Sequence, residues 1–94
     1  MKRLSNKEIL NELSLLNDWV LNDNQITKVY KLNSFMEVMS LANLVSDKSE
    51  QIDHHPKMII DFNQIEFLIT THSEGGITSL DFLLASFIEE TYNE

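Results

Sequence analysis

The spacing of apolar side chains changes repeatedly along the chain between a helical and a strand-like period. Over residues 5–16 it is helical, with apolar side chains three or four positions apart: Ile9, Leu10, Leu13 and Leu16. Ser5 and Glu8 occupy the N-cap and N3 positions of a capping box, which predicts a helix from here to about Leu16. Asn17 and Asp18 follow, and both residue types favour turns over helix interiors.

Two pairs of short segments have the alternating pattern of β-strands. Residues 19–21 and 26–32 are separated by the polar segment 22–24, whose Asn and Asp residues favour a turn, so they predict a first hairpin. Residues 57–62 and 65–70 alternate apolar and polar side chains around a turn that contains an asparagine. These two segments predict a second hairpin.

Two further helices are predicted, one after each hairpin. Ser34 and Glu37 have the spacing of a capping box, and the helix that they open should run to about Lys48, where polar residues follow. Its apolar stripe has helical spacing and consists of Phe35, Val38, Met39, Ala42 and Val45. The last helix should begin after Thr78 as N-cap, with Asp81 at N3.

The Gly75–Gly76 pair in front of the last helix predicts a tight connection with positive φ. Trp19 and Phe62 are expected to be core aromatic residues. The order helix-strand-strand-helix-strand-strand-helix predicts an α+β fold, a four-stranded antiparallel sheet with three helices on one face. Ninety-four residues suffice for one thin hydrophobic core, so residues 1–94 are expected to form a single domain.

Composition and charge narrow the function classes. The formal net charge is −8, and the seven basic residues are spread along the chain, so no basic surface for nucleic acid is expected. A neutral small molecule or a protein partner fits this charge better than an anionic phosphate. The apolar runs are far too short for a membrane span, and the basic N-terminus lacks the apolar segment of a signal peptide. The absence of cysteine excludes disulfides and thiolate chemistry, and a cytoplasmic location is the default expectation.

The three histidines lie in two short segments. Residues 50–56 contain His54 and His55, and residues 70–76 contain His72 together with both glycines. Adjacent strand residues point to opposite faces, so His54 and His55 would share a space only where the backbone is irregular. His72 follows the strand parity of the positions that should face away from the helices, and a crevice on that side could gather all three imidazoles.

This cluster fits acid–base chemistry, because histidine titrates near neutral pH. Glu50 and Asp53 are candidates to fix an imidazole tautomer. Asp81 is a third candidate, although its N3 position also gives it a plain role in helix capping. Zinc or iron binding by the histidines is a weaker alternative, because the chain has no His-x-His or His-x3-His spacing.

These residues resemble a known family. The series Glu50-x3-His54-His55-Pro56, Phe62, His72 and Asp81 is similar to the signature of the pterin-4a-carbinolamine dehydratases. The segments "IDHHP", "TTHSEGGITSLDFLLASFIEE" and "FMEVMSLANLV" also resemble that family, and Trp19 stands where its members often have a tryptophan. The resemblance covers nearly the whole chain, and its long, gapped motif is more specific than "HHP" alone.

The resemblance implies a lyase that dehydrates 4a-hydroxytetrahydropterin, such as 4a-hydroxytetrahydrobiopterin, to quinonoid dihydropterin without metal or cofactor. It implies His54, His55 and His72 as acid–base residues. It also implies a set of residues that bind the pterin: Glu50, Asp53, Thr70, Thr71, Ser73 and Asp81. Homodimers that often pair into tetramers through sheet edges and helices are expected, with no membrane or direct nucleic-acid partner.

The chain departs from the family pattern at Met58, where many relatives have an aromatic residue, so the resemblance implies a pterin pocket without that aromatic contact. The alternative function is that of a protein-binding module, because members of the family also serve as dimerisation cofactors of transcription factors. The full set of three histidines favours the enzyme.

Overall fold

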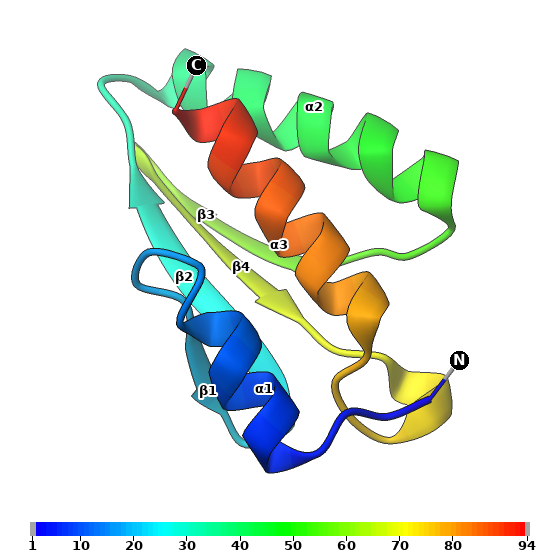
Figure 1. Ribbon diagram of the computed structural model, residues 1–94. Coiled ribbons are helices and arrows are strands. Elements are labelled where there is room, and N and C mark those ends of the chain that lie inside the picture. The colour runs from blue at the N-terminus through cyan, green and yellow to red at the C-terminus, as the bar shows by residue number, and fades with distance from the viewer. Residues whose placement is uncertain (1, 94) are drawn as a thin grey trace.

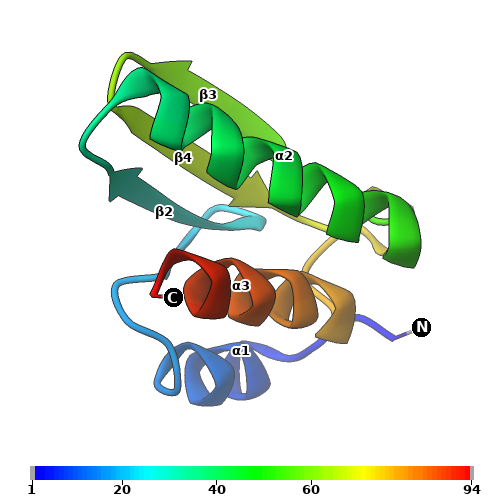
Figure 2. The same cartoon turned by 90° about the horizontal axis from the view of Figure 1, so that it is seen from above.

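The computed structural model describes residues 2–93. Its elements follow one another as α1 (Asn6–Leu13), β1 (Val20–Asn22), β2 (Gln25–Lys31), α2 (Phe35–Ile52), β3 (Lys57–Asp61), β4 (Gln64–Ile69), the 3₁₀ turn η1 (His72–Glu74) and α3 (Ser79–Tyr92). All three α-helices lie on one side of the sheet (Figure 1). Seen from above, α2 follows the β3–β4 side, α3 lies in the middle and α1 lies beyond α3 (Figure 2). The predicted α+β fold is confirmed.

The sheet has the strand order β1-β2-β4-β3, and each neighbouring pair is antiparallel. The two hairpins therefore join through β2 and β4, where Ile26 pairs with Ile69 and Tyr30 with Ile65. These four side chains are at most 1% exposed and face the helices, because alternate residues of a strand share one face. No helix among residues 2–93 is long and apolar enough to cross a membrane.

The first helix is shorter than its apolar pattern predicts. Its capping box at Ser5 and Glu8 is present, but α1 ends at Leu13, not near Leu16. Ser14 is the C-cap, and its hydroxyl donates to the carbonyl of Asn11 at 2.6 Å, in competition with continued helical hydrogen bonding. Trp19 is buried as expected, but it precedes β1, which begins at Val20 and ends at Asn22.

The second helix is longer than predicted, and this decides where the first histidines lie. Instead of ending near Lys48, α2 continues to Ile52. The hydroxyls of Ser46 and Ser49 donate to carbonyls one turn earlier, each at 2.7 Å, so these polar residues are accommodated within the helix. At its start, Ser34 caps as predicted, but the Glu37 carboxylate accepts from the backbone of Asn33, so the capping box is incomplete.

One expectation about the turns is wrong, and another is confirmed for one of its two residues. Phe62 lies in the turn between β3 and β4, outside the strand and the core, with φ at 48° and a side chain that is 68% exposed. Of the glycine pair, Gly75 has positive φ, at 71°, whereas Gly76 packs against the Arg3 side chain, so that a Cβ there would lie 2.5 Å from Arg3 Cδ. The capping box of Thr78 and Asp81 at the start of α3 is confirmed.

A polar network lies in the core between β2 and α3. The Glu89 carboxylate accepts hydrogen bonds from the Tyr30 hydroxyl and the Lys28 ammonium, and the Trp19 indole donates to the Tyr30 oxygen at 3.1 Å. Burial and the adjacent carboxylate raise the pKa of Tyr30 well above its usual value. Burial opposes ionisation of Glu89, but hydrogen bonds from Lys28 and Tyr30 outweigh it and lower the pKa of Glu89.

Candidate active site

Three of the candidate residues are buried: His54, Thr71 and Asp81. His54 follows the end of α2 and is 9% exposed, and Asp81 lies in the first turn of α3 and is fully buried. Their side chains meet at 2.6 Å between His54 Nε2 and Asp81 Oδ1. Asp81 was expected either to cap a helix or to partner an imidazole, and it does both. Oδ1 partners His54, and Oδ2 accepts from the backbone NH of Thr78 at 2.8 Å, which caps α3.

The turn that ends α2 directs His54 inward. Asp53 has left-handed backbone angles, φ 51° and ψ 47°, and the NH of His54 donates to the carbonyl of Ser49 at 2.9 Å. This is the hydrogen-bond pattern of a Schellman motif, in which glycine usually occupies the left-handed position. The reversal at Asp53 turns the chain back toward the start of α3, where Asp81 lies. Because Asp53 is not glycine, this conformation carries some backbone strain.

Two threonines hold the Asp81 carboxylate in place. The Thr71 hydroxyl donates to Asp81 Oδ2 at 2.8 Å and lies 2.9 Å from the Thr78 hydroxyl. Since Thr71 uses its one hydrogen on Asp81, Thr78 must be the donor in the second bond. Thr78 was expected only as a helix cap. Its link to Thr71 depends on the bridge between Thr71 and Gly76, a tertiary feature that local spacing does not reveal.

The hydrogen-bond network assigns the tautomer of His54. Asp81 is an acceptor, so Nε2 of His54 carries the hydrogen and Nδ1 is left for other chemistry. Among residues 2–93, no buried side-chain nitrogen or oxygen lacks a partner, and none of the hydrogen bonds found there involves Nδ1. Nδ1 therefore reaches the surface of the protein. It can accept a proton when the ring is neutral and donate one when the ring is charged.

The neighbouring His55 has a different environment. Its side chain is 54% exposed, and Nε2 forms a hydrogen bond with the carboxylate of Glu50, which is itself 77% exposed on the last turn of α2. The side chains of His54 and His55 therefore do not share one enclosed space. The Asp53 carboxylate is exposed and takes part in none of the hydrogen bonds found among residues 2–93, so it is available to a ligand.

His72 lies at a surface hollow, one residue after Thr71, whose hydroxyl donates to Asp81. The strand β4 ends at Ile69, so the parity argument for His72 fails, and the residue begins the η1 turn with its side chain exposed. With Thr70 it lines a cavity of about 310 Å³, together with residues 23–24 of the β1–β2 turn, Gln25 of β2 and both glycines. Neither His54 nor His55 lines this cavity.

The predicted residues thus fall into three groups. Thr71 and Asp81 join His54 inside the protein, Glu50 joins His55 at the surface, and Thr70 joins His72 at its cavity, with Ser73 exposed beside it. Within residues 2–93, no group of three or more histidine and acidic side chains is arranged to hold a metal ion. Met58 is half-buried on β3 and packs against the core.

A family model and the relatives with similar sequences carry the same family description. The family model described as "Pterin 4 alpha carbinolamine dehydratase" matches residues 2–91. A relative from Sulfurisphaera tokodaii, provisionally named a pterin-4-alpha-carbinolamine dehydratase, is 39% identical over 90 residues that cover 96% of this chain and 97% of its own. A relative from Chloroflexus aurantiacus with the same provisional name is 37% identical over 90 residues, with the same coverage of both chains.

Solved structures agree with the fold. The crystal structure of a transcriptional coactivator/pterin dehydratase from Brucella melitensis has a TM-score of 0.90 and 29% identity, covering 93% of this chain and 95% of its own. A pterin dehydratase-like protein described as a RuBisCO assembly factor in the alpha-carboxysome has a TM-score of 0.66, covering 79% of this chain and 88% of its own. At 12% identity the latter shows a shared fold alone.

Proposed function

The chain belongs to the pterin-4a-carbinolamine dehydratase family, and from this premise we propose that it dehydrates a 4a-hydroxytetrahydropterin to a quinonoid dihydropterin by histidine acid–base catalysis. The observation that carries the proposal is the buried pair of His54 and Asp81. In this pair one imidazole nitrogen is held by a carboxylate and the other reaches the surface. A proton-transfer group needs this combination of a fixed ring and a free nitrogen.

The chemistry requires two proton transfers. The C4a–O bond breaks as the N5 lone pair forms the C4a=N5 double bond, so the leaving hydroxyl must receive a proton and N5 must lose one. In the proposed mechanism, Nδ1 of protonated His54 delivers the proton to the hydroxyl while Nε2–H remains on Asp81. A positioned acid or base contributes roughly 10²–10⁴-fold to such a transfer.

The remaining candidate residues have supporting roles in the proposal. His55 and His72 orient the ring and move the N5 proton, and Glu50 holds His55 through the hydrogen bond described above. Asp53 contacts the pterin through its unpaired, exposed carboxylate. Thr70 and Ser73 flank the pterin near His72. Backbone NH and carbonyl groups around Thr71 form hydrogen bonds with the amide-like edge of the pterin. The buried Thr71 and Asp81 side chains act on His54 and do not contact the ligand.

We propose further that the product feeds the recycling of a pterin cofactor, such as that of a hydroxylase, because a quinonoid dihydropterin needs only reduction to return to the tetrahydro form. A cytoplasmic location and a homodimer or homotetramer are part of the same proposal. Light scattering of the purified protein tests the oligomer, with a monomer at all concentrations as the contradicting result.

Turnover separates this proposal from the second candidate function. The Brucella melitensis relative is described as both coactivator and dehydratase, so a protein-binding role without turnover is the alternative for this chain. The test is the initial rate at which the purified protein converts 4a-hydroxytetrahydrobiopterin, followed by absorbance. A rate well above the spontaneous dehydration supports the enzyme. A folded protein that adds nothing to the spontaneous rate supports the binding module.

A further inference from the structure

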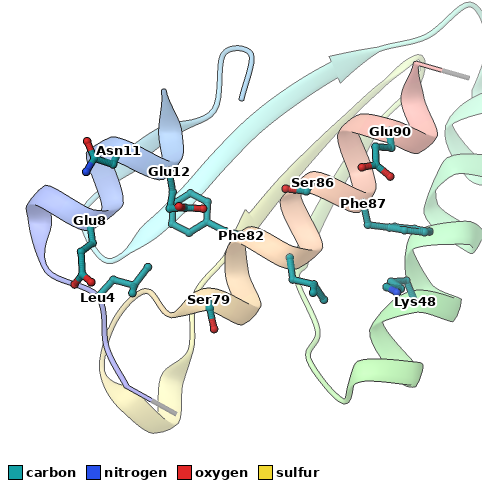
Figure 3. Close-up of a pocket in the computed structure, with 11 residues that line it drawn as sticks. Leu4, Glu8, Asn11, Glu12, Lys48, Ser79, Phe82, Ser86, Phe87 and Glu90 are labelled. Carbon is teal, nitrogen blue, oxygen red and sulfur yellow. The ribbon is translucent and has the colours of Figure 1, made fainter. Parts of the chain in front are cut away.

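A second surface hollow lies on the helical side of the molecule, away from the histidines. It is a groove of about 660 Å³ that runs over the outer side of α3, with α1 on one flank and Lys48 of α2 on the other (Figure 3). None of His54, His55, His72 or Asp81 lines it. The groove therefore has no part in the proposed dehydration.

The groove is long because it follows one face of a helix. The α3 residues that line it recur with helical spacing from Ser79 to Glu90, at steps of three and four. Glu90 lies eleven residues after Ser79, so at a rise of 1.5 Å per residue this face of α3 extends for about 17 Å, or about three helical turns. On α1 the lining residues are Glu8, Asn11 and Glu12, which again share one face. Such an elongated hollow suits a helix from another chain better than a compact small molecule.

The apolar residues of the groove are Leu4, which precedes α1, and three residues of α3. Phe82 forms its buried floor, Phe87 is partly exposed, and the Leu83 side chain is 47% exposed. In Figure 3, Phe82 points toward α1 and Phe87 toward Lys48 of α2. The Lys48 ammonium lies 5.4 Å from the centre of the Phe87 ring, within reach of a cation–π interaction. An apolar stripe of a docked helix would cover Leu83 and Phe87.

The charged part of the groove is acidic. Glu8, Glu12 and Glu90 are exposed at its edges, and Lys48 is the one basic residue among those that line it. Hydrogen bonds with the backbone and side chain of Ser5 lower the pKa of Glu8, so it is ionised at neutral pH. A second copy of this chain, with 15 acidic and 7 basic residues, would meet repulsion there.

We infer that this groove, which we call the α3 groove, binds a basic amphipathic helix of a partner protein. The partner helix presents Leu or aromatic side chains at i, i+3 or i+4, and i+7 to Leu83 and Phe87, with Lys or Arg residues toward Glu12 and Glu90. This is the helix-in-groove mode of recognition, with charge complementarity adding specificity.

The experiment selects a displayed library of random 16-residue peptides on the full-length wild-type protein. Enriched peptides should share basic residues and an apolar stripe of helical spacing. The strongest one, made synthetically, should bind about tenfold or more weakly to the double variant Glu12→Lys/Glu90→Lys and to Leu83→Ala. Glu8 is left unchanged because it caps α1.

Two matched variants serve as controls. Leu44→Ala removes a leucine of similar exposure, 50%, from α2, and Glu66→Lys reverses a charge on the sheet face opposite the helices. Both should bind the peptide like wild type, and all variants should retain wild-type dehydratase activity. Amide NMR shifts of wild type with the peptide should map to residues 8–12 and 79–90. The inference is overturned if no peptide is enriched or if the enriched peptides lack basic residues. It is also overturned if the amide shifts map around Leu44 on α2 and Leu44→Ala is the variant that weakens peptide binding.

Discussion

Replacement of Asp81 by asparagine isolates the effect of its carboxylate on His54. Asp81 accepts from Thr71 and from the NH of Thr78 through one oxygen, and from His54 Nε2 through the other. An asparagine can keep its oxygen toward Thr71 and Thr78 and place its NH₂ group toward His54. Nε2 of His54 must then accept a hydrogen bond, and the proton of the neutral ring moves to Nδ1.

The magnitudes make asparagine more informative than alanine. Alanine would leave three buried donors without an acceptor, at about 1–3 kcal/mol each, which approaches the whole stability of a domain of this size. In Asp81→Asn, two hydrogen bonds to a charged oxygen become bonds to a neutral one, which should cost about 2–3 kcal/mol in total. The variant should therefore remain folded at 25 °C with a Tm lower by on the order of 10–20 °C.

Two readouts follow from the change of tautomer. In ¹⁵N NMR, the neutral His54 ring should carry its proton on Nε2 in wild type and on Nδ1 in Asp81→Asn. The kcat for pterin dehydration should fall by roughly 10²–10⁴-fold, because the charged ring that donates from Nδ1 also carries a hydrogen on Nε2, which the NH₂ group of asparagine cannot accept. Asp47→Asn on α2 makes the same exchange of aspartate for its amide at an exposed position, and as the control it should change neither the tautomer of His54 nor kcat. The same tautomer in both proteins, or a kcat within about threefold of wild type, would refute the reasoning.

Two further predictions concern stability and ligand contact. Glu89→Gln should lower the free energy of unfolding at pH 7 by on the order of 3 kcal/mol, because Lys28 loses the charge that it meets in the core. Since the pKa of Glu89 is depressed in the fold, its contribution is present above the unfolded value of about 4.3 and lost as pH falls through the folded value. In urea unfolding measured from pH 7 to pH 3, the free energies of unfolding of wild type and Glu89→Gln should therefore become equal at acid pH. A difference that stays constant with pH would show that it does not come from the charge of Glu89. Asp53→Gly should stabilise the fold by up to about 1 kcal/mol, since glycine suits the left-handed position. It should nevertheless raise the KM for the pterin substrate about tenfold through loss of the carboxylate. An unchanged KM would exclude Asp53 as a pterin contact.

The order of the elements and the two hairpins were predictable because hydrophobic period and capping residues are local signals, whereas the pairing of β2 with β4 is a long-range contact that these signals do not reveal. Errors arose where a residue type is compatible with two local structures. Ser46 and Ser49 suggested the end of a helix but satisfy their hydroxyls within it, so α2 extends to Ile52. Phe62 continued the alternation of its strand, yet the two-residue turn between β3 and β4 places it outside the core.

The candidate site was predictable in its residues but not in its grouping. Asp81 was identified both as a cap and as a partner for an imidazole, and its two oxygens divide these roles. The inward turn of His54 depends on a left-handed Asp53, a conformation that the sequence does not signal because glycine normally takes it. Thr78 joins the site through a hydrogen bond with Thr71, seven residues earlier. The β-bridge between Thr71 and Gly76 brings these two residues together, and it exists only in the folded chain.

The most direct test of the proposed role of His54 is the kcat of His54→Gln and His54→Ala for 4a-hydroxytetrahydropterin. The glutamine variant retains an NH donor for Asp81 and therefore the fold, whereas the alanine variant also leaves the carboxylate without this partner. Circular dichroism and Tm establish that each protein is folded. We predict that kcat of both variants falls by roughly 10²–10⁴-fold, toward the spontaneous rate. Turnover near the wild-type value in folded His54→Gln would contradict the assignment of His54 as the proton donor.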